Sequence, residues 1–189
     1  MTEAMNAWQP TDAALMASLA EGQVDALGPL YLRYGRMVKS LMLRLEPGLT
    51  LEQCDDLSQE VFLTLLDTAG RYQEQQRLKS WLCGISAKRL LGWRRRRWSR
   101  QRLLDRHGEA GAAVALGGAV RPDMQAGARQ DLARAMAVLS SDMRATVVLH
   151  HIEGLDATEV AETLGISTNT VWTRLHRARA LIRQALESG

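Results

Sequence analysis

The residues best suited to chemistry lie near the C-terminus, where threonine, asparagine and arginine recur on one side of an expected helix. They are Thr168, Asn169, Thr170, Thr173, Arg174 and Arg177. Arginine can bind guanine through two hydrogen bonds, and asparagine and threonine can reach base edges or phosphates. This set therefore favours contact with nucleic acid over catalysis.

Residues 157–176 have the form of a helix-turn-helix, which would present this set to a DNA groove. Gly165 suits the turn, and Ala161 is small enough for two helices to cross closely. The inward-facing apolar residues are Val160, Leu164, Ile166, Val171 and Leu175. A helical hairpin used only in packing is the alternative. We expect Trp172 to pack beside Leu175, the alternative being contact with the DNA backbone.

A second basic segment lies in the middle of the chain. Residues 76–106 carry 11 basic and 1 acidic side chains, whereas residues 1–75 carry 5 and 11. Such a block attracts polyanions, and aromatic faces near it can stack on unpaired bases. The alternative is that this basic block is only a solvated helix face. We expect Trp81 to be a core residue, and for Trp98 both a core position and stacking on a base stay open. The expected DNA contacts are Lys88, Arg89, Arg94, Arg95, Arg96 and Arg97.

The composition predicts an all-α fold, because alanine, leucine and arginine dominate and only four prolines occur. We expect two small helical domains, residues 10–100 and 129–189, joined by a flexible linker over 101–128, with the C-terminal domain a helix-turn-helix. A short alanine-rich helix is the alternative for the linker. Asp12, Asp25 and Thr50 are expected helix caps. The first three expected helices end at Ala20, before Pro47 and near Gly70. Further helices are expected over about 78–98, 130–138, 141–152, 157–164 and 168–186.

Several classes of function lack a signature in this sequence. There is no P-loop, dinucleotide fingerprint or nucleophile elbow, so we expect no catalytic residue, cofactor or small-molecule substrate. His150 and His151 are adjacent and should point apart, and Cys54 and Cys83 are expected to be buried thiols, so no metal site is expected. No apolar run approaches the roughly 18 residues of a membrane span, and no secretion signal begins the chain, so we expect a cytoplasmic protein.

Several segments, taken in order, resemble the extracytoplasmic-function (ECF, group IV) family of bacterial RNA polymerase sigma factors. The resemblance covers roughly residues 12–98 and 130–187. Residues 55–62 are similar to the family's polymerase-contacting helix, and residues 78–97 to the helix that reads and melts the minus-ten element. Residues 139–144 resemble the entry to region four, and residues 165–179 its reader of the minus-thirty-five element.

The resemblance implies a promoter-specific initiation factor whose partners are core RNA polymerase, promoter DNA and an anti-sigma factor. Loop 71–77 is implied to hold a flipped base, through Tyr72, Gln73, Gln75 and Gln76. The implied polymerase contacts are Asp55, Asp56, Gln59, Glu60 and Phe62. Ala87, Lys88, Gly92 and Trp172 depart from the residues usual in the family.

Two other functions are compatible with parts of this pattern. A stand-alone helix-turn-helix regulator would bind duplex DNA unaided as a dimer, and would need neither residues 51–67 nor the central basic block. A protein-interaction module without a DNA role would show no salt-dependent DNA binding. Binding to DNA with and without polymerase therefore separates the three.

Overall fold

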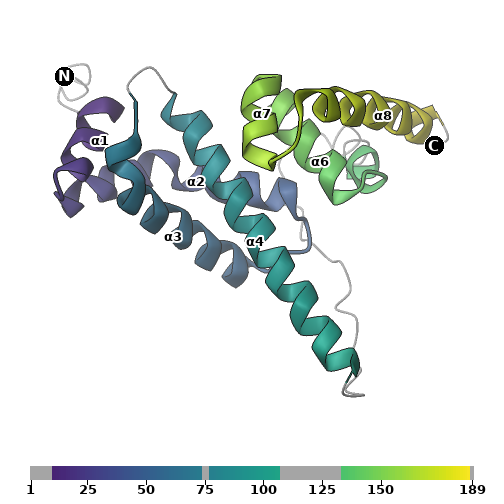
Figure 1. The fold of residues 1–189 in the computed structure, drawn as a ribbon, viewed down its shortest axis with the longest axis horizontal. Coiled ribbons are helices and arrows are strands. Elements are labelled where there is room, and N and C mark those ends of the chain that lie inside the picture. The colour runs from purple at the N-terminus through teal and green to yellow at the C-terminus, as the bar shows by residue number, and fades with distance from the viewer. Residues whose placement is uncertain (1–9, 74–76, 107–132, 188–189) are drawn as a thin grey trace, which may run out of the picture.

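A computed structural model describes residues 10–73, 77–106 and 133–187 (Figure 1). The N-terminal bundle contains α1 (Asp12–Ala20), α2 (Leu27–Leu45), α3 (Leu51–Thr68) and α4 (Leu78–Arg106), with 3₁₀ turns at Val24–Ala26 and Ala69–Arg71. The C-terminal unit begins with a helical segment over 133–137, followed by α6 (Ser141–Val147), a π-helical turn (Val148–Ile152), α7 (Ala157–Leu164) and α8 (Thr168–Glu187). The described residues include no strand, so the all-α prediction is confirmed.

The N-terminal bundle is held together by apolar faces of α2, α3 and α4, which pack against one another (Figure 1). Leu30 and Leu41 of α2, Leu57 and Leu65 of α3 and Leu82 of α4 are fully buried. The removal of such side chains from water is the main favourable term in forming the bundle. These helices place the polar residues of α3 and α4 on the outside, where partners can reach them.

The caps of the first three helices differ in part from those expected. Thr50 caps α3 through a reciprocal capping box with Gln53, as predicted. Thr11, and not Asp12, caps α1, because the Thr11 hydroxyl accepts the hydrogen bond from the Ala14 N–H. Asp25 lies inside the 3₁₀ turn, and α2 begins without a side-chain cap.

Asp12 has a different structural role from the predicted cap. Its carboxylate accepts hydrogen bonds from Arg33 and from the hydroxyl of Tyr34, and so ties α1 to α2. Burial, followed by the hydrogen bond to Asp12, raises the pKa of Tyr34 to about 12. The tyrosine therefore remains a hydrogen-bond donor at neutral pH.

α4 is longer than the sequence analysis predicted. It continues past residue 98 to Arg106, so the first residues of the predicted linker are helical. Residues 99–106 contain neither glycine nor proline, and Gly108 is the first strong helix breaker that follows. The remainder of the predicted linker, residues 107–128, lies outside the described residues.

The C-terminal unit has the predicted helix-turn-helix. Asp156 caps α7 in a capping box with Glu159, and Gly165 ends α7 in the left-handed conformation with φ +66°. Val160, Val171 and Leu175 are buried between the helices. The crossing of α7 and α8 therefore rests on the residues that the sequence analysis named.

The backbone of Gly165 gives a stability prediction. No atom lies within 4 Å of where a Cβ would stand, so Gly165→Ala should cost only the left-handed backbone strain, about 1 kcal/mol. Gly70→Ala is the matched control, because Gly70 is equally open but does not have a positive φ. Urea unfolding should show the loss for Gly165→Ala alone; an equal loss in both variants would contradict the strain argument.

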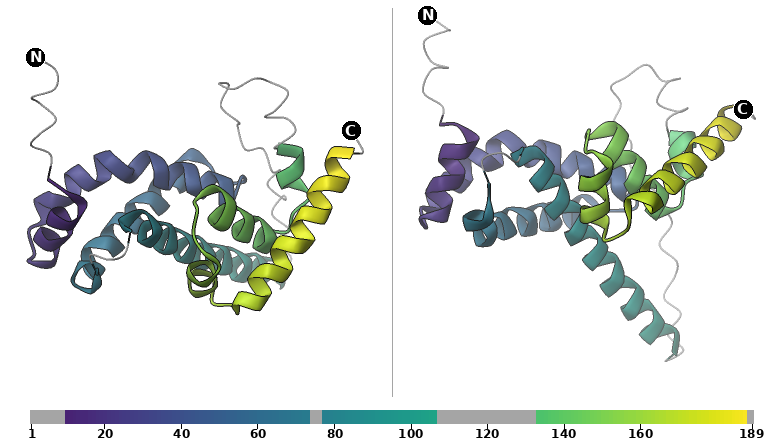
Figure 2. Two further views of the ribbon diagram at one scale, coloured as in Figure 1. Left: turned by 90° about the horizontal axis from the view of Figure 1, so that it is seen from above. Right: turned by 45° about the horizontal axis from the view of Figure 1, so that its top comes forward.

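The two helical units are in contact with each other. α7 packs against α4, and α6 with its π-helical turn packs against α2. Figure 2 shows α7 beside α4 from two further directions. Their buried residues form one continuous apolar cluster. The two units are therefore docked together in this structure, although the sequence analysis expected only a flexible connection between them.

Candidate nucleic-acid and protein interfaces

The first candidate site is the outward face of α8. Thr168, Asn169 and Arg177 are exposed, as a DNA-reading face requires. Thr173 is exposed too, although its hydroxyl donates to the carbonyl oxygen of Asn169 at 2.9 Å. Thr170 is half-buried, with its hydroxyl 2.8 Å from that of Ser167. The helix start is thus ordered by its own short polar side chains.

Arg174 is placed differently from Arg177. Its guanidinium Nη2 lies 2.9 Å from Oδ2 of Asp142 in α6, and its side chain is mostly buried. A base contact by Arg174 would require it to leave this ion pair, whereas Arg177 is exposed. Arg177 is therefore the better placed of the two arginines to contact a base.

Trp172 is 55% exposed, and its ring lies edge-on to that of His150 at 5.6 Å. Its packing beside Leu175 stays a prediction. His150 and His151 do not point apart as expected, because their rings lie 4.8 Å from each other on the π-helical turn. A π-helical turn changes the angle between successive side chains, which an α-helical projection cannot anticipate.

The second candidate site is a hollow on α4, of about 490 Å³, which we call the basic surface. Trp81 and Ile85 supply apolar walls, and Thr64 and Thr68 of α3 supply hydroxyl groups. Its cationic residues are Arg71, Lys88, Arg89, Arg95 and Arg96. Cationic groups around an aromatic ring suit a nucleic-acid strand, because they follow its phosphates while the ring contacts a base.

The arginines predicted along α4 are not equally available. Arg89 donates from Nε to the Thr64 hydroxyl at 2.7 Å and lies 3.7 Å from Glu60, which also lies 4.0 Å from Arg96. Arg94 pairs with Glu46 at 3.8 Å. Lys88, Arg95, Arg96 and Arg97 are exposed. The guanidinium of Arg97 sits 5.3 Å from the ring centre of Trp93.

The aromatic residues beside the basic surface support one another. Trp81 stacks on Tyr72, with ring centres 5.1 Å apart and an interplanar angle of 17°. Trp81 is partly buried against the core, in agreement with its predicted core position, but it also forms a wall of the basic surface. Gln73 is exposed, whereas the predicted contacts Gln75 and Gln76 lie outside the described residues. Trp98 is exposed near the far end of α4.

The third candidate site is an apolar pocket of about 330 Å³ between α2 and α3. Its lining residues are Leu27, Gly28, Tyr31, Gln59, Phe62 and Leu63. Leu63 is 56% exposed, whereas Phe62 is only 3% exposed and lies edge-on to Tyr31 at 5.0 Å. A large exposed leucine beside an apolar hollow is typical of a protein contact. Gln59 and Phe62 are predicted from the sequence as polymerase contacts, whereas Leu63 and Tyr31 are not.

The acidic residues predicted on α3 separate into two groups. Asp56 is exposed, and Asp55 is exposed with its Oδ1 2.7 Å from Nζ of Lys39. Glu60 turns away to Arg89 and Arg96 and so belongs to the edge of the basic surface. Asp55 and Asp56 are therefore available beside the apolar pocket, whereas the carboxylate of Glu60 is directed to arginines of α4.

Other kinds of site are not supported in the described part of the chain. It contains no group of three or more potential metal ligands. Its helices include none with the length and apolar character needed to cross a bilayer. Cys54 and Cys83 are buried free thiols, as predicted. Burial raises the pKa of both thiols, to about 12 for Cys83.

Comparison with known proteins matches the two helical units to two parts of one family. Residues 30–100 match the model described as Sigma-70 region 2, and residues 129–182 match Sigma-70, region 4. The chain is 28% identical over 171 residues to RNA polymerase sigma factor CarQ of Myxococcus xanthus, covering 90% of this chain and 95% of that protein. It is 33% identical over 134 residues to ECF RNA polymerase sigma factor SigE of Mycolicibacterium smegmatis, covering 70% and 51%.

Solved structures agree with the fold. The structure of CnrH in complex with the cytosolic domain of CnrY matches with a TM-score of 0.60 at 24% identity, covering 94% of this chain and 97% of that chain. Sigma factor RpoE in complex with the anti-sigma factor NepR, from Bartonella quintana, matches with a TM-score of 0.63 at 22% identity, covering 83% and 94%. With a basic surface on α4, an exposed polar face on α8 and both sigma regions matched in order, the chain belongs to the extracytoplasmic-function group of the sigma-70 family of RNA polymerase sigma factors.

Proposed function

We propose that this sigma factor directs promoter-specific initiation by dividing three tasks among α3, α4 and α8. One observation carries the proposal: a single chain presents an apolar pocket on α3, the basic surface on α4 and an exposed polar face on α8. A stand-alone regulator that binds duplex DNA would need neither the apolar pocket nor the basic surface. The proposed units are residues 10–100, with α4 reaching beyond them, and residues 129–189.

The apolar pocket is the proposed docking point for core polymerase. Leu63 and Tyr31 expose apolar area there, with Gln59 supplying a hydrogen-bonding group and Asp55 and Asp56 a charged edge. An apolar centre with a polar rim is the usual anatomy of a protein interface. Phe62 contributes from beneath, because its buried ring supports Tyr31.

The basic surface is the proposed binding site for the opened minus-ten strand. Lys88, Arg95 and Arg96 are exposed to bind phosphates, while Arg89 is held by Thr64 and Glu60 at the edge. Trp81, stacked on Tyr72, offers an aromatic wall for an unpaired base. The loop that follows Tyr72, including Gln73, Gln75 and Gln76, is proposed to hold the flipped base.

The exposed face of α8 is the proposed reader of the minus-thirty-five element. Arg177→Ala should cost about 1–3 kcal/mol in promoter affinity if Arg177 contacts a guanine. Arg183→Ala is the control, because Arg183 is also exposed but lies further along the helix. Holoenzyme binding to matched and mutated minus-thirty-five sequences measures both variants. Equal losses for all sequences in both variants would remove the base-reading role.

Two further features belong to this proposal. An anti-sigma factor is a proposed partner, because the similar structures of CnrH and of RpoE each hold a bound protein, in RpoE one named as an anti-sigma factor. The cytoplasm is the proposed location, because polymerase works there. The chain is proposed to have no catalytic role, because polymerase carries out the chemistry of initiation.

Footprinting on promoter fragments tests the proposal against the stand-alone regulator. We expect protection of the minus-ten and minus-thirty-five elements only when core polymerase is present. Protection of a duplex site by the chain alone, unchanged when polymerase is added, would favour the regulator. No salt-dependent binding under either condition would favour a protein-interaction module.

A further inference from the structure

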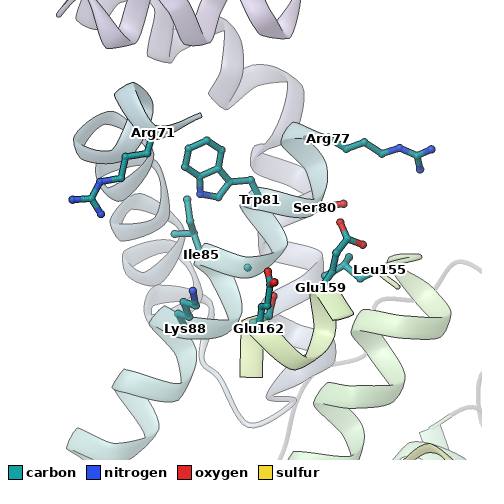
Figure 3. A pocket seen from close by; sticks show the side chains of 11 residues that line it. Arg71, Arg77, Ser80, Trp81, Ile85, Lys88, Leu155, Glu159 and Glu162 are labelled. Carbon is teal, nitrogen blue, oxygen red and sulfur yellow. The ribbon is translucent and has the colours of Figure 1, made fainter. Parts of the chain in front are cut away.

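The aromatic wall of the basic surface is a pair of rings rather than a single one. Trp81 of α4 stacks on Tyr72, which directly follows the 3₁₀ turn Ala69–Arg71, with ring centres 5.1 Å apart. Figure 3 shows Trp81 with Ile85 and Lys88 along α4. One face of Trp81 therefore depends on Tyr72 for support, and the orientation of the wall depends on the turn.

This turn is held against α1 by loose packing. α1 contacts the turn, and Ala69 is buried there. A hollow of about 470 Å³ remains between the two, lined by small side chains of α1, such as Ala14 and Ala17, and by Gly70 and Tyr72 on the other side. Packing alone therefore leaves the turn room to shift, and polar contacts have to fix α1 in place.

Asp12, in the first turn of α1, supplies these polar contacts. Its Oδ1 accepts a hydrogen bond from Arg33 and its Oδ2 accepts one from the hydroxyl of Tyr34, both on α2. Arg33 also donates from Nη2 to the backbone oxygen of Pro10 at 3.1 Å. Hydrogen bonds to a carboxylate are among the stronger ones in proteins. The start of α1 is thus fixed on α2 through two neighbouring side chains.

Tyr34 connects this carboxylate to the aromatic wall. Burial, followed by the hydrogen bond to Asp12, raises the pKa of Tyr34 to about 12, and the nearby phenol of Tyr72 adds to the rise. Tyr34, Tyr72 and Trp81 are partly buried against the same apolar core. A series of neighbouring side chains therefore leads from α1 to the basic surface, in the order Asp12, Tyr34, Tyr72 and Trp81.

We propose that Asp12 and Tyr34 are positioning residues for base selection: they fix α1, and through it the turn, so that Tyr72 holds Trp81 in the orientation that receives an unpaired base. The inference rests on the proposed function, because it takes Trp81 and Tyr72 as the wall for that base. A site selects one base only if the residues behind it hold it rigid. Loss of this support should therefore weaken the contribution of the base more than that of the strand phosphates.

Binding of holoenzyme to fork-junction DNA separates this role from a general effect. The measured quantity is the ratio of two affinities, for a fork that carries a base and for the same fork made abasic, at the unpaired position where base removal costs the unmodified holoenzyme most. Tyr34→Phe removes only the hydroxyl group and should lower this ratio at least about fivefold, because stacking of the base is partly lost. Its affinity for the abasic fork should change less than about twofold, because the phosphate contacts remain. An unchanged ratio would overturn the inference, and so would equal losses on both forks.

Asp12→Asn removes the charge from the same hydrogen bond and should lower the ratio in the same direction. Asp25→Asn is the matched control, because Asp25 is exposed in the 3₁₀ turn between α1 and α2; this change should alter the ratio less than about twofold. Tyr34→Phe combined with Asp12→Asn should lose no more than Asp12→Asn alone, because the two residues act through one hydrogen bond. Fully additive losses would overturn the inference.

Trp81→Ala distinguishes a failure of the inference from a failure of the proposed function. This variant should lower the ratio at least as far as Tyr34→Phe does. If Trp81→Ala leaves the ratio unchanged, the wall does not receive a base and the proposed function is at fault. If Trp81→Ala lowers the ratio and Tyr34→Phe does not, the inference alone is overturned.

Discussion

Leu63→Asp is expected to weaken binding to core RNA polymerase by about 3 kcal/mol, which is roughly 100-fold in affinity. Leu63 is 56% exposed at the apolar pocket, so the variant should fold normally. Docking would then bury a carboxylate against apolar groups, in addition to losing the area that leucine contributes. Fluorescence anisotropy of labelled chain titrated with core polymerase measures the loss.

Leu32→Asp is the matched control for this experiment. Leu32 is 85% exposed on α2 and does not line the apolar pocket, so the same chemical change there should alter the affinity less than about threefold. A loss of similar size in both variants would show that polymerase responds to charge on the bundle in general. An unchanged affinity of the Leu63→Asp variant for core polymerase would show that polymerase docks elsewhere than at the apolar pocket.

Lys88→Glu is expected to reduce open-complex formation by about 2 kcal/mol, roughly 30-fold, without changing polymerase binding. Lys88 is exposed and lines the basic surface. The change removes one phosphate contact and adds a repelling charge. The slope of log affinity against log salt should also become shallower by about 1. Permanganate reactivity of the melted region, measured over a salt series, reports both effects.

Arg36→Glu makes the same change in net charge at an exposed position of α2. It should leave both the permanganate signal and the salt slope close to those of the unmodified chain. Equal losses in Lys88→Glu and Arg36→Glu would mean that overall charge, rather than the basic surface, attracts the promoter.

The sequence predicts those parts of the fold that local rules determine. The Thr50 and Asp156 capping boxes, the turn at Gly165 and the buried faces of α7 and α8 all follow from short-range patterns. The length of α4 was underestimated, because arginine-rich helical sequence without an apolar period looks like the start of a loop. Periodicity detects a buried face, and the last turns of this helix do not have one.

The candidate sites show where such patterns stop being informative. Leu63 was missed because an exposed leucine next to buried Phe62 has no signature along one helix; its meaning comes from Tyr31 on α2. Arg174 and Arg177 look equivalent in sequence, yet Asp142 binds only the first of them in the structure. Glu153 forms ion pairs with Arg44 and Lys79, which lie 109 and 74 positions away in the sequence, and no local rule predicts such pairs.

Run-off transcription from a broad library of upstream sequences, with purified core polymerase and this chain, tests the central claim most directly. We expect transcripts to begin at a small set of positions that share two upstream elements, and only when the chain is added. Start positions that are identical with and without the chain would contradict its role as a promoter-specific initiation factor.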